Sequence, residues 1–131
     1  MISTRKLRQA MHDIAAKRGE FTLFALFMRA DSSAGRWDLV VAAPWLATRN
    51  LKALREFVAL LSKSVGESNL RNFSRVETVG DNDPTVNLIL SKFPVEDGEL
   101  RVSKLRLFGL EIEDAIILRA KRPARASAGA A

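Results

Sequence analysis

The sequence predicts an α+β domain in which about five strands form a largely antiparallel sheet with three helices, in the order α-β-β-α-β-α-β-β. Stretches with apolar residues every three or four positions alternate with short runs rich in apolar, β-branched and aromatic residues. Turn residues join two pairs of these runs into hairpins, which requires antiparallel pairing, while helical connections permit some parallel pairing. The 131 residues, 47% of them hydrophobic, suffice for one domain with its own core.

Three stretches have the apolar spacing of an amphipathic helix. The first two are about 4–18 and about 50–65. The third starts at Pro84, and Phe93 is the last residue of its inner face. Ser3 or Thr4 caps the first helix, and Gly19 is placed for a left-handed C-terminal cap. Gly66 ends the second helix. Asp83 caps the third, which has proline at its first position, so that Asp81-Asn82-Asp83 is a turn and not a calcium loop.

Five runs are predicted strands: about 20–29, 36–43, 73–79, 99–107 and 110–120. The first is apolar on both faces, which is typical of a central strand covered on both sides. Residues 31–35 form the turn of the first hairpin by composition, and Pro44 ends its second strand because proline cannot donate to a sheet ladder. The second hairpin turns near Gly109. Residues 1–120 are therefore expected to form a single globular domain, followed by a basic, alanine-rich tail over 121–131.

The composition excludes several classes of chemistry. The chain has no cysteine, which excludes disulfides, thiolate metal sites and cysteine nucleophiles. Its one histidine, His12, precedes Asp13, but adjacent helical residues point about 100° apart, so catalytic use would need a partner brought in by folding. A phosphate-binding glycine loop and a nucleophile elbow are both missing, and we expect no cofactor. No export signal or membrane-length apolar run is evident, which favours a cytoplasmic protein without a membrane partner.

The net charge of +6 is concentrated at the two ends of the chain. Residues 1–20 carry +3 and residues 119–131 carry +4, which leaves −1 for the residues between them. The basic ends suggest a nucleic-acid contact through Arg5, Arg8, His12, Lys121, Arg122 and Arg125. A solvated outer face of an amphipathic helix explains the first three of these more simply, since charged outer faces are routine, and we favour that interpretation because no nucleic-acid-binding motif accompanies them.

Three acidic residues lie within predicted strands, where acidic side chains are uncommon: Asp38, Glu77 and Asp114. If their strands adjoin with the same facing, these carboxylates could bind Mg²⁺ or act as an acid–base pair in a metal-dependent hydrolase. The simpler alternative is that each faces solvent or pairs across the sheet with Arg75, Arg101 or Lys104. We favour this alternative and predict no metal site.

Four large side chains are candidates for a contact surface: Trp37, Trp45, Leu60 and Leu88. Tryptophan is enriched at binding hot spots, although core packing explains Trp45 more simply. The two leucines point away from the main apolar stripe of their helices. The absence of catalytic motifs and these apolar positions together favour a non-catalytic domain that acts through protein contacts. Self-association into a homo-oligomer is the leading hypothesis, and binding to a different protein partner is its weaker form.

Overall fold

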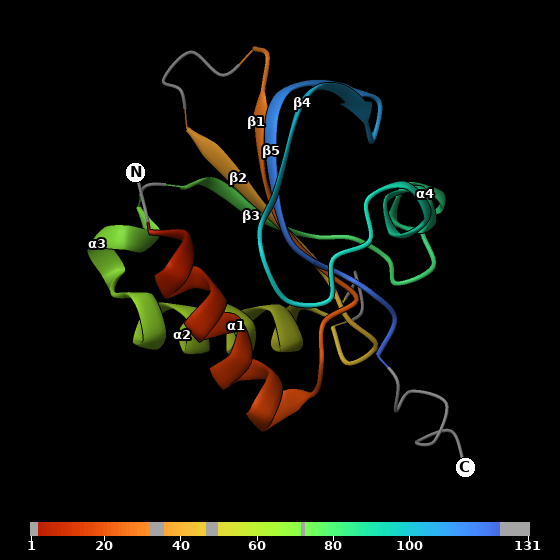
Figure 1. Ribbon diagram of the computed structural model, residues 1–131. Helices are drawn as coiled ribbons and strands as arrows, with labels where there is room; N and C mark the ends of the chain where they lie inside the picture. Colours follow the sequence, from red (N-terminus) through yellow and green to blue (C-terminus); the bar gives the residue numbers. More distant parts are fainter. Residues whose placement is uncertain (1–2, 32–35, 47–49, 72, 124–131) are drawn as a thin grey trace.

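The computed structural model describes residues 3–31, 36–46, 50–71 and 73–123, and it confirms the predicted α+β class and element order (Figure 1). Its elements are α1 (Thr4–Arg18), β1 (Leu23–Arg29), β2 (Trp37–Ala42), α2 (Leu51–Val65), α3 (Glu67–Leu70), β3 (Phe73–Thr78), α4 (Pro84–Lys92), β4 (Leu100–Leu107) and β5 (Leu110–Ala120). The sequence did not predict the one-turn helix α3. Within the described residues, no helix has the length and apolar character needed to cross a membrane.

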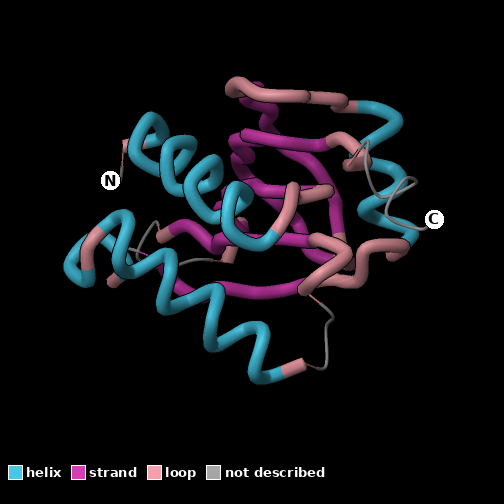
Figure 2. Tube along the Cα trace, turned by 90° about the horizontal axis from the view of Figure 1, so that it is seen from below, coloured by secondary structure: helices cyan, strands magenta, loops and turns pink. Residues whose placement is uncertain are grey.

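The five strands form one mixed sheet in the order β3-β2-β1-β5-β4. Both hairpins are antiparallel, and β1 and β5 also pair antiparallel, which joins the two hairpins at the centre of the sheet. The exception is the parallel pair of β2 and β3, which helix α2 connects by crossing one face of the sheet. As a result β3 and β4 are the two edges of the sheet, whose strands are magenta in Figure 2.

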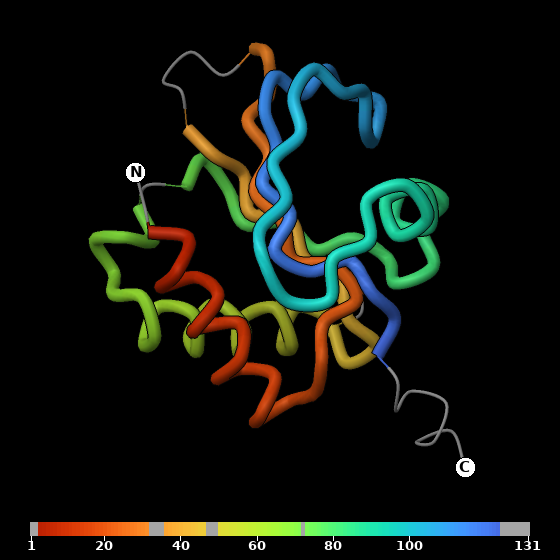
Figure 3. Tube along the Cα trace, in the orientation of Figure 1, coloured from red at the N-terminus to blue at the C-terminus, as the bar shows by residue number. Residues whose placement is uncertain are grey.

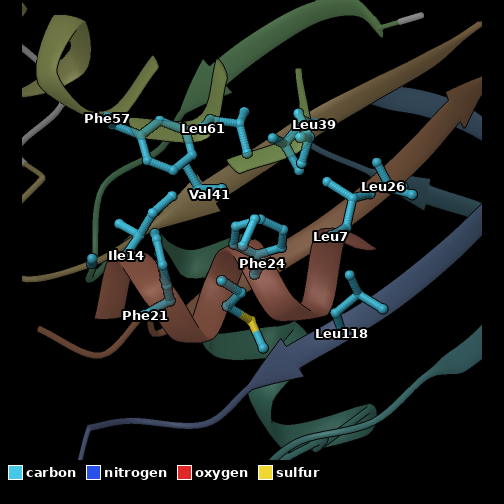
Figure 4. Close-up of a cluster of buried hydrophobic side chains, with 14 of the residues drawn as sticks. Leu7, Ile14, Phe21, Phe24, Leu26, Leu39, Val41, Phe57, Leu61 and Leu118 are labelled. Atoms are coloured by element: carbon cyan, nitrogen blue, oxygen red, sulfur yellow. The ribbon is translucent and has the colours of Figure 1, made fainter. Parts of the chain in front are cut away.

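Helices α1 and α2 cover one face of the sheet, which we call the first face (Figures 1 and 4). The side chains of Phe24 and Leu26 on β1 are fully buried there against Leu7 of α1 and Leu61 of α2. Phe21, just before β1, packs edge-on against Phe24, with ring centroids 5.0 Å apart. This aromatic and aliphatic core contains the larger of the two groups of buried residues.

The opposite, second face has a thinner cover, made of α4 and the far end of the β4–β5 hairpin. Val86 and Ile89 of α4 pack on this face with Leu23 and Ala25 of β1. The tip of the hairpin curves toward the side of the sheet where α4 lies (Figure 3). A register shift opposite Met28 and Arg29 accompanies this curvature, as expected where a bulge increases the bend of a strand.

The predicted N-terminal caps are confirmed at Ser3 and Asp83, whose side chains accept hydrogen bonds from backbone amides in the first turns of α1 and α4. The side chain of Asn50, which was not predicted as a cap, does the same for α2. Gly19 does end α1, but its φ of 121° and ψ of 162° lie outside the left-handed helical region that the sequence led us to expect. A side chain there would also contact Trp45, whose indole Nε1 donates to the carbonyl of Gly19 at 2.9 Å.

The aromatic cluster on the first face predicts a large effect on stability. The Phe21 ring contacts the rings of Phe24, Trp45 and Phe57, and Phe21→Ala should lower the free energy of unfolding by about 3–5 kcal/mol. Leu51→Ala is the control, because the Leu51 side chain is 63% exposed and its loss should cost less than about 0.5 kcal/mol. Urea denaturation of both variants measures the difference, and equal midpoints would contradict this packing.

Candidate functional site

A cavity of about 100 Å³ lies on the second face, where β1, β2 and β3 meet the tip of the β4–β5 hairpin. We call it the Asp38 cavity. Its polar lining comes from three adjacent strands, and its apolar lining includes two aromatic rings. The residues that matter for its chemistry are Phe27, Arg29, Asp38, Arg75, Glu77 and Phe108.

Asp38 is the most deeply buried charged side chain of this cavity, with 4% of the side chain exposed. Its Oδ2 accepts a hydrogen bond from Nε of Arg29 at 2.8 Å, and Nε of Arg75 lies 3.5 Å from the same oxygen. The Asp38 Oδ1 is also buried but accepts no hydrogen bond from any residue that the structure describes. Arg75 additionally lies 3.4 Å from Glu77, and Arg29 donates to Asp31 at 3.2 Å.

Asp114 lies on the first face, bound by a basic residue. It is paired in register with Met28, whose side chain packs against the core beneath α1 and α2. Arg101 donates to both carboxylate oxygens, at 2.7 Å for the shortest contact, and the backbone amide of Ala115 also donates to Asp114. The Arg101 hydrogen bonds hold the pKa of Asp114 below its ordinary value, although burial opposes them.

The three strand carboxylates therefore do not converge. Asp38 and Glu77 line one cavity on the second face, whereas Asp114 is bound to Arg101 on the opposite face. Among the residues that the structure describes, no three histidine or acidic side chains are grouped as a metal site would require. This arrangement supplies no support for the metal-dependent hydrolase that the sequence raised as an alternative.

The basic residues of α1 are engaged by the loop that precedes β4. Nε2 of His12 lies 3.1 Å from Oδ1 of Asp97, and Arg8 donates to the same oxygen at 3.4 Å. Burial raises the pKa of Asp97, but His12 and Arg8 outweigh that effect and hold it below its ordinary value. Folding thus gives His12 a carboxylate partner that is not its sequence neighbour, while Arg5 is exposed.

Two of the three C-terminal candidates for nucleic-acid contact also bind acidic residues of the domain. Lys121 lies 3.2 Å from Glu96, and Arg122 donates to both the carbonyl and the carboxylate of Asp81. Arg122 further contacts Asn87 of α4, which ties the end of β5 to that helix. Arg125 and the rest of 124–131 lie outside the described residues. Much of the basic charge near the chain ends thus neutralises nearby carboxylates.

The four candidate contact residues have different positions. Trp37 is buried in the core of the first face, with Arg101 stacked 5.9 Å from its ring centroid. Trp45 and Leu60 are partly buried against the same core. Leu88 alone among them is largely exposed, at 43%, on the outer side of α4. The tryptophans therefore contribute mainly to packing, as we expected for Trp45.

Sequence reasoning missed three residues that shape these sites: Arg29, Asp97 and Phe108. Arg29 had a usable signal, because the predicted antiparallel pairing of 20–29 with 36–43 brings a basic residue at the end of β1 near Asp38 on β2; most of the predicted turn at 31–35 lies outside the described residues. Asp97 and Phe108 had none, since both lie in turns whose placement depends on tertiary contacts. Comparison with protein-family models, curated proteins and solved structures found no match for the chain.

The environment of Asp114 predicts that its contribution to stability depends on pH. A carboxyl whose pKa is lowered by folding stabilises the protein above its unfolded pKa, and this contribution disappears as the pH falls through the folded pKa. At pH 7, Asp114→Asn should therefore lower the free energy of unfolding by about 1 kcal/mol, because Arg101 is half exposed. The difference from the parent protein should shrink as the pH drops below about 4, the ordinary pKa of the carboxyl, toward its lower folded pKa.

Thermal unfolding at pH 7 and pH 3 measures this effect. Glu113→Gln is the matched control, because Glu113 is an exposed neighbour on the same strand. Its melting temperature should equal that of the parent protein at both pH values. A stabilising effect of Asp114→Asn at pH 7 would contradict the assignment, since it would mean that the carboxylate is repelled by its surroundings and not held by Arg101.

Proposed function

We propose that this protein acts by association, as a non-catalytic domain that forms a homodimer through the outer edge of β3. The observation that carries the proposal is the order of side chains along this edge, Arg75-Val76-Glu77, which is complementary to itself when two copies run antiparallel. A symmetric dimer needs such a surface. If residue i of one copy contacts residue j of the other, the two-fold axis requires that residue j of the first copy also contacts residue i of the second.

The two edges of the sheet differ in how well they suit strand pairing. Lys104 interrupts β4 with a φ of 56°, and Arg101 and Arg106 add further positive charge along the same strand. Kinks and basic residues of this kind discourage pairing at an exposed edge. In contrast, β3 contains no proline and no residue of positive φ, and among the described strands it pairs only with β2.

The backbone of β3 is oriented for a second partner. The amide of Val79, just beyond the strand, donates to the carbonyl of Val41 on β2 at 3.0 Å. Because the amide and carbonyl of a residue point to the same side of a strand and alternate along it, those of Glu77 also point toward β2. The corresponding groups of Val76 and Thr78 point outward, where another strand can bond to them.

A two-fold axis at Val76 combines these features. Val76 then forms a hydrogen-bonded pair with Val76 of the partner subunit, and Arg75 lies directly opposite Glu77 of the partner subunit in a pair without backbone hydrogen bonds. Side chains in such pairs are especially close, with Cα atoms about 4.5 Å apart. Each opposite-charge pair contributes about 0.2–1 kcal/mol, and the symmetry supplies it twice. The result is one continuous sheet through both subunits.

Sedimentation equilibrium tests the dimer directly. At concentrations of tens of micromolar and above, the parent protein should have twice the monomer mass of 14.5 kDa. Glu77→Arg should shift the mass toward that of the monomer, because it places arginines opposite each other at two points of the interface. Thr78→Pro should do the same by removing an outward-pointing amide while the amides that bond to β2 remain.

Glu111→Arg is the matched control, since it makes the same charge change at the exposed tip of the β4–β5 hairpin and should remain dimeric. Mixing the Glu77→Arg and Arg75→Glu variants should restore a dimer, because a β3 strand with two arginines then pairs with a β3 strand that has two glutamates. A parent protein that stays monomeric at every concentration, or a folded Glu77→Arg variant that associates as strongly as the parent, would overturn the proposal.

A further inference from the structure

We infer that the Asp38 cavity is a binding site for an alkylammonium group, whether from a free primary amine or from a lysine side chain. The inference does not depend on the dimer. It starts from the buried Oδ1 of Asp38, which accepts no hydrogen bond from the described residues although its companion Oδ2 is bound by Arg29. Buried carboxylate oxygens in native proteins are nearly always satisfied, so this oxygen points to a missing donor.

The charges around the cavity favour a cationic donor. The charged side chains that line the cavity balance one another, because the carboxylates of Asp38 and Glu77 lie 2.8 to 3.5 Å from the guanidinium groups of Arg29 and Arg75. Arg29 also binds Asp31 at 3.2 Å, and this third carboxylate is 74% exposed and lies outside the lining. With Asp31 included, the linked network has one net negative charge. A monocation balances it, whereas an anion would add to the excess and a neutral donor would leave it in place.

The size and walls of the cavity restrict the cation further. At about 100 Å³ it is far smaller than the 300–1,000 Å³ of a typical drug-sized ligand site, so only a small group enters. Apolar side chains, including Phe27, Val40 and Ile112, form much of the lining beside Asp38. This combination suits an ammonium at the end of a short alkyl stem, with the stem against the apolar wall and aromatic rings available to the charge.

Phe108 provides a separate indication that the cavity is functional. It has a φ of 54° in a two-residue turn with Gly109, whose φ is 74°. Turns with two positive φ values favour Asn-Gly, and a bulky aromatic residue at the first position is strained. The strained position lets the Phe108 ring lie 6.1 Å from that of Phe27 and form one side of the cavity. Backbone strain of this kind concentrates at binding sites.

The test is an NMR titration of the ¹⁵N-labelled protein with n-propylammonium chloride. Saturable shifts should be centred on the amides of Phe27, Arg29, Asp38 and Phe108. Sodium chloride at equal ionic strength, 1-propanol and sodium propionate should not reproduce them. A parallel titration with Nα-acetyl-lysine amide separates the two sources: binding of both probes indicates a site open to a lysine of a partner chain, and binding of propylammonium alone indicates a site for free amines.

Variants tie the shifts to the cavity. Asp38→Asn should weaken binding at least about tenfold, because a charge-assisted hydrogen bond becomes a neutral one. Asp114→Asn makes the same change on the opposite face and should leave binding unaltered. Phe108→Asn is a second variant that suits the turn and should raise the melting temperature while weakening binding. No saturable shift with either amine would mean that only water fills the cavity, and equal binding by Asp38→Asn and the parent would mean that the amine does not bind the Asp38 carboxylate. Either result would overturn the inference.

Discussion

The burial of β1 on both faces determines how the other elements of the domain are arranged. Phe24 and Leu26 alternate along it with Leu23, Ala25 and Phe27, and all five side chains are buried. Both faces must therefore be covered. The first receives two helices of fifteen residues each, whereas the second receives only the nine residues of α4 and the curved tip of the β4–β5 hairpin. The thinner cover leaves room for the Asp38 cavity between the sheet and that tip.

The same central strand determines which strands become edges. Because β1 pairs with both β2 and β5, the strands beyond these, β3 and β4, each have one unpaired side within the described structure. Lys104 interrupts one of these edges with an unfavourable backbone conformation. Arg75 and Glu77 make the other edge complementary to itself, and Arg75 also contacts Asp38. Arg75 thus lies at the boundary between the proposed dimer interface and the proposed amine site.

Much of this fold was predictable because local signals agreed with one another. The two apolar faces of β1 predicted a central strand, and the Asp83-Pro84 pair marked the start of α4 to the residue. The facing of the strand carboxylates was not predictable. Ile112 and Asp114 are two residues apart and should share a face, but the register shift opposite Met28 and Arg29 places them on opposite faces. A bulge reverses the alternation, and nothing in the local sequence marks this one.

Hydrogen exchange at single amides of β3 tests whether this edge is where two copies of the chain meet. The amide of Glu77 points toward β2, and those of Val76 and Thr78 point outward. If the dimer forms through β3, the amide of Glu77 stays protected at all protein concentrations, whereas the protection of Val76 and Thr78 appears at high concentration and is lost on dilution. Exchange of Val76 and Thr78 at unprotected rates in concentrated protein would contradict this dimer.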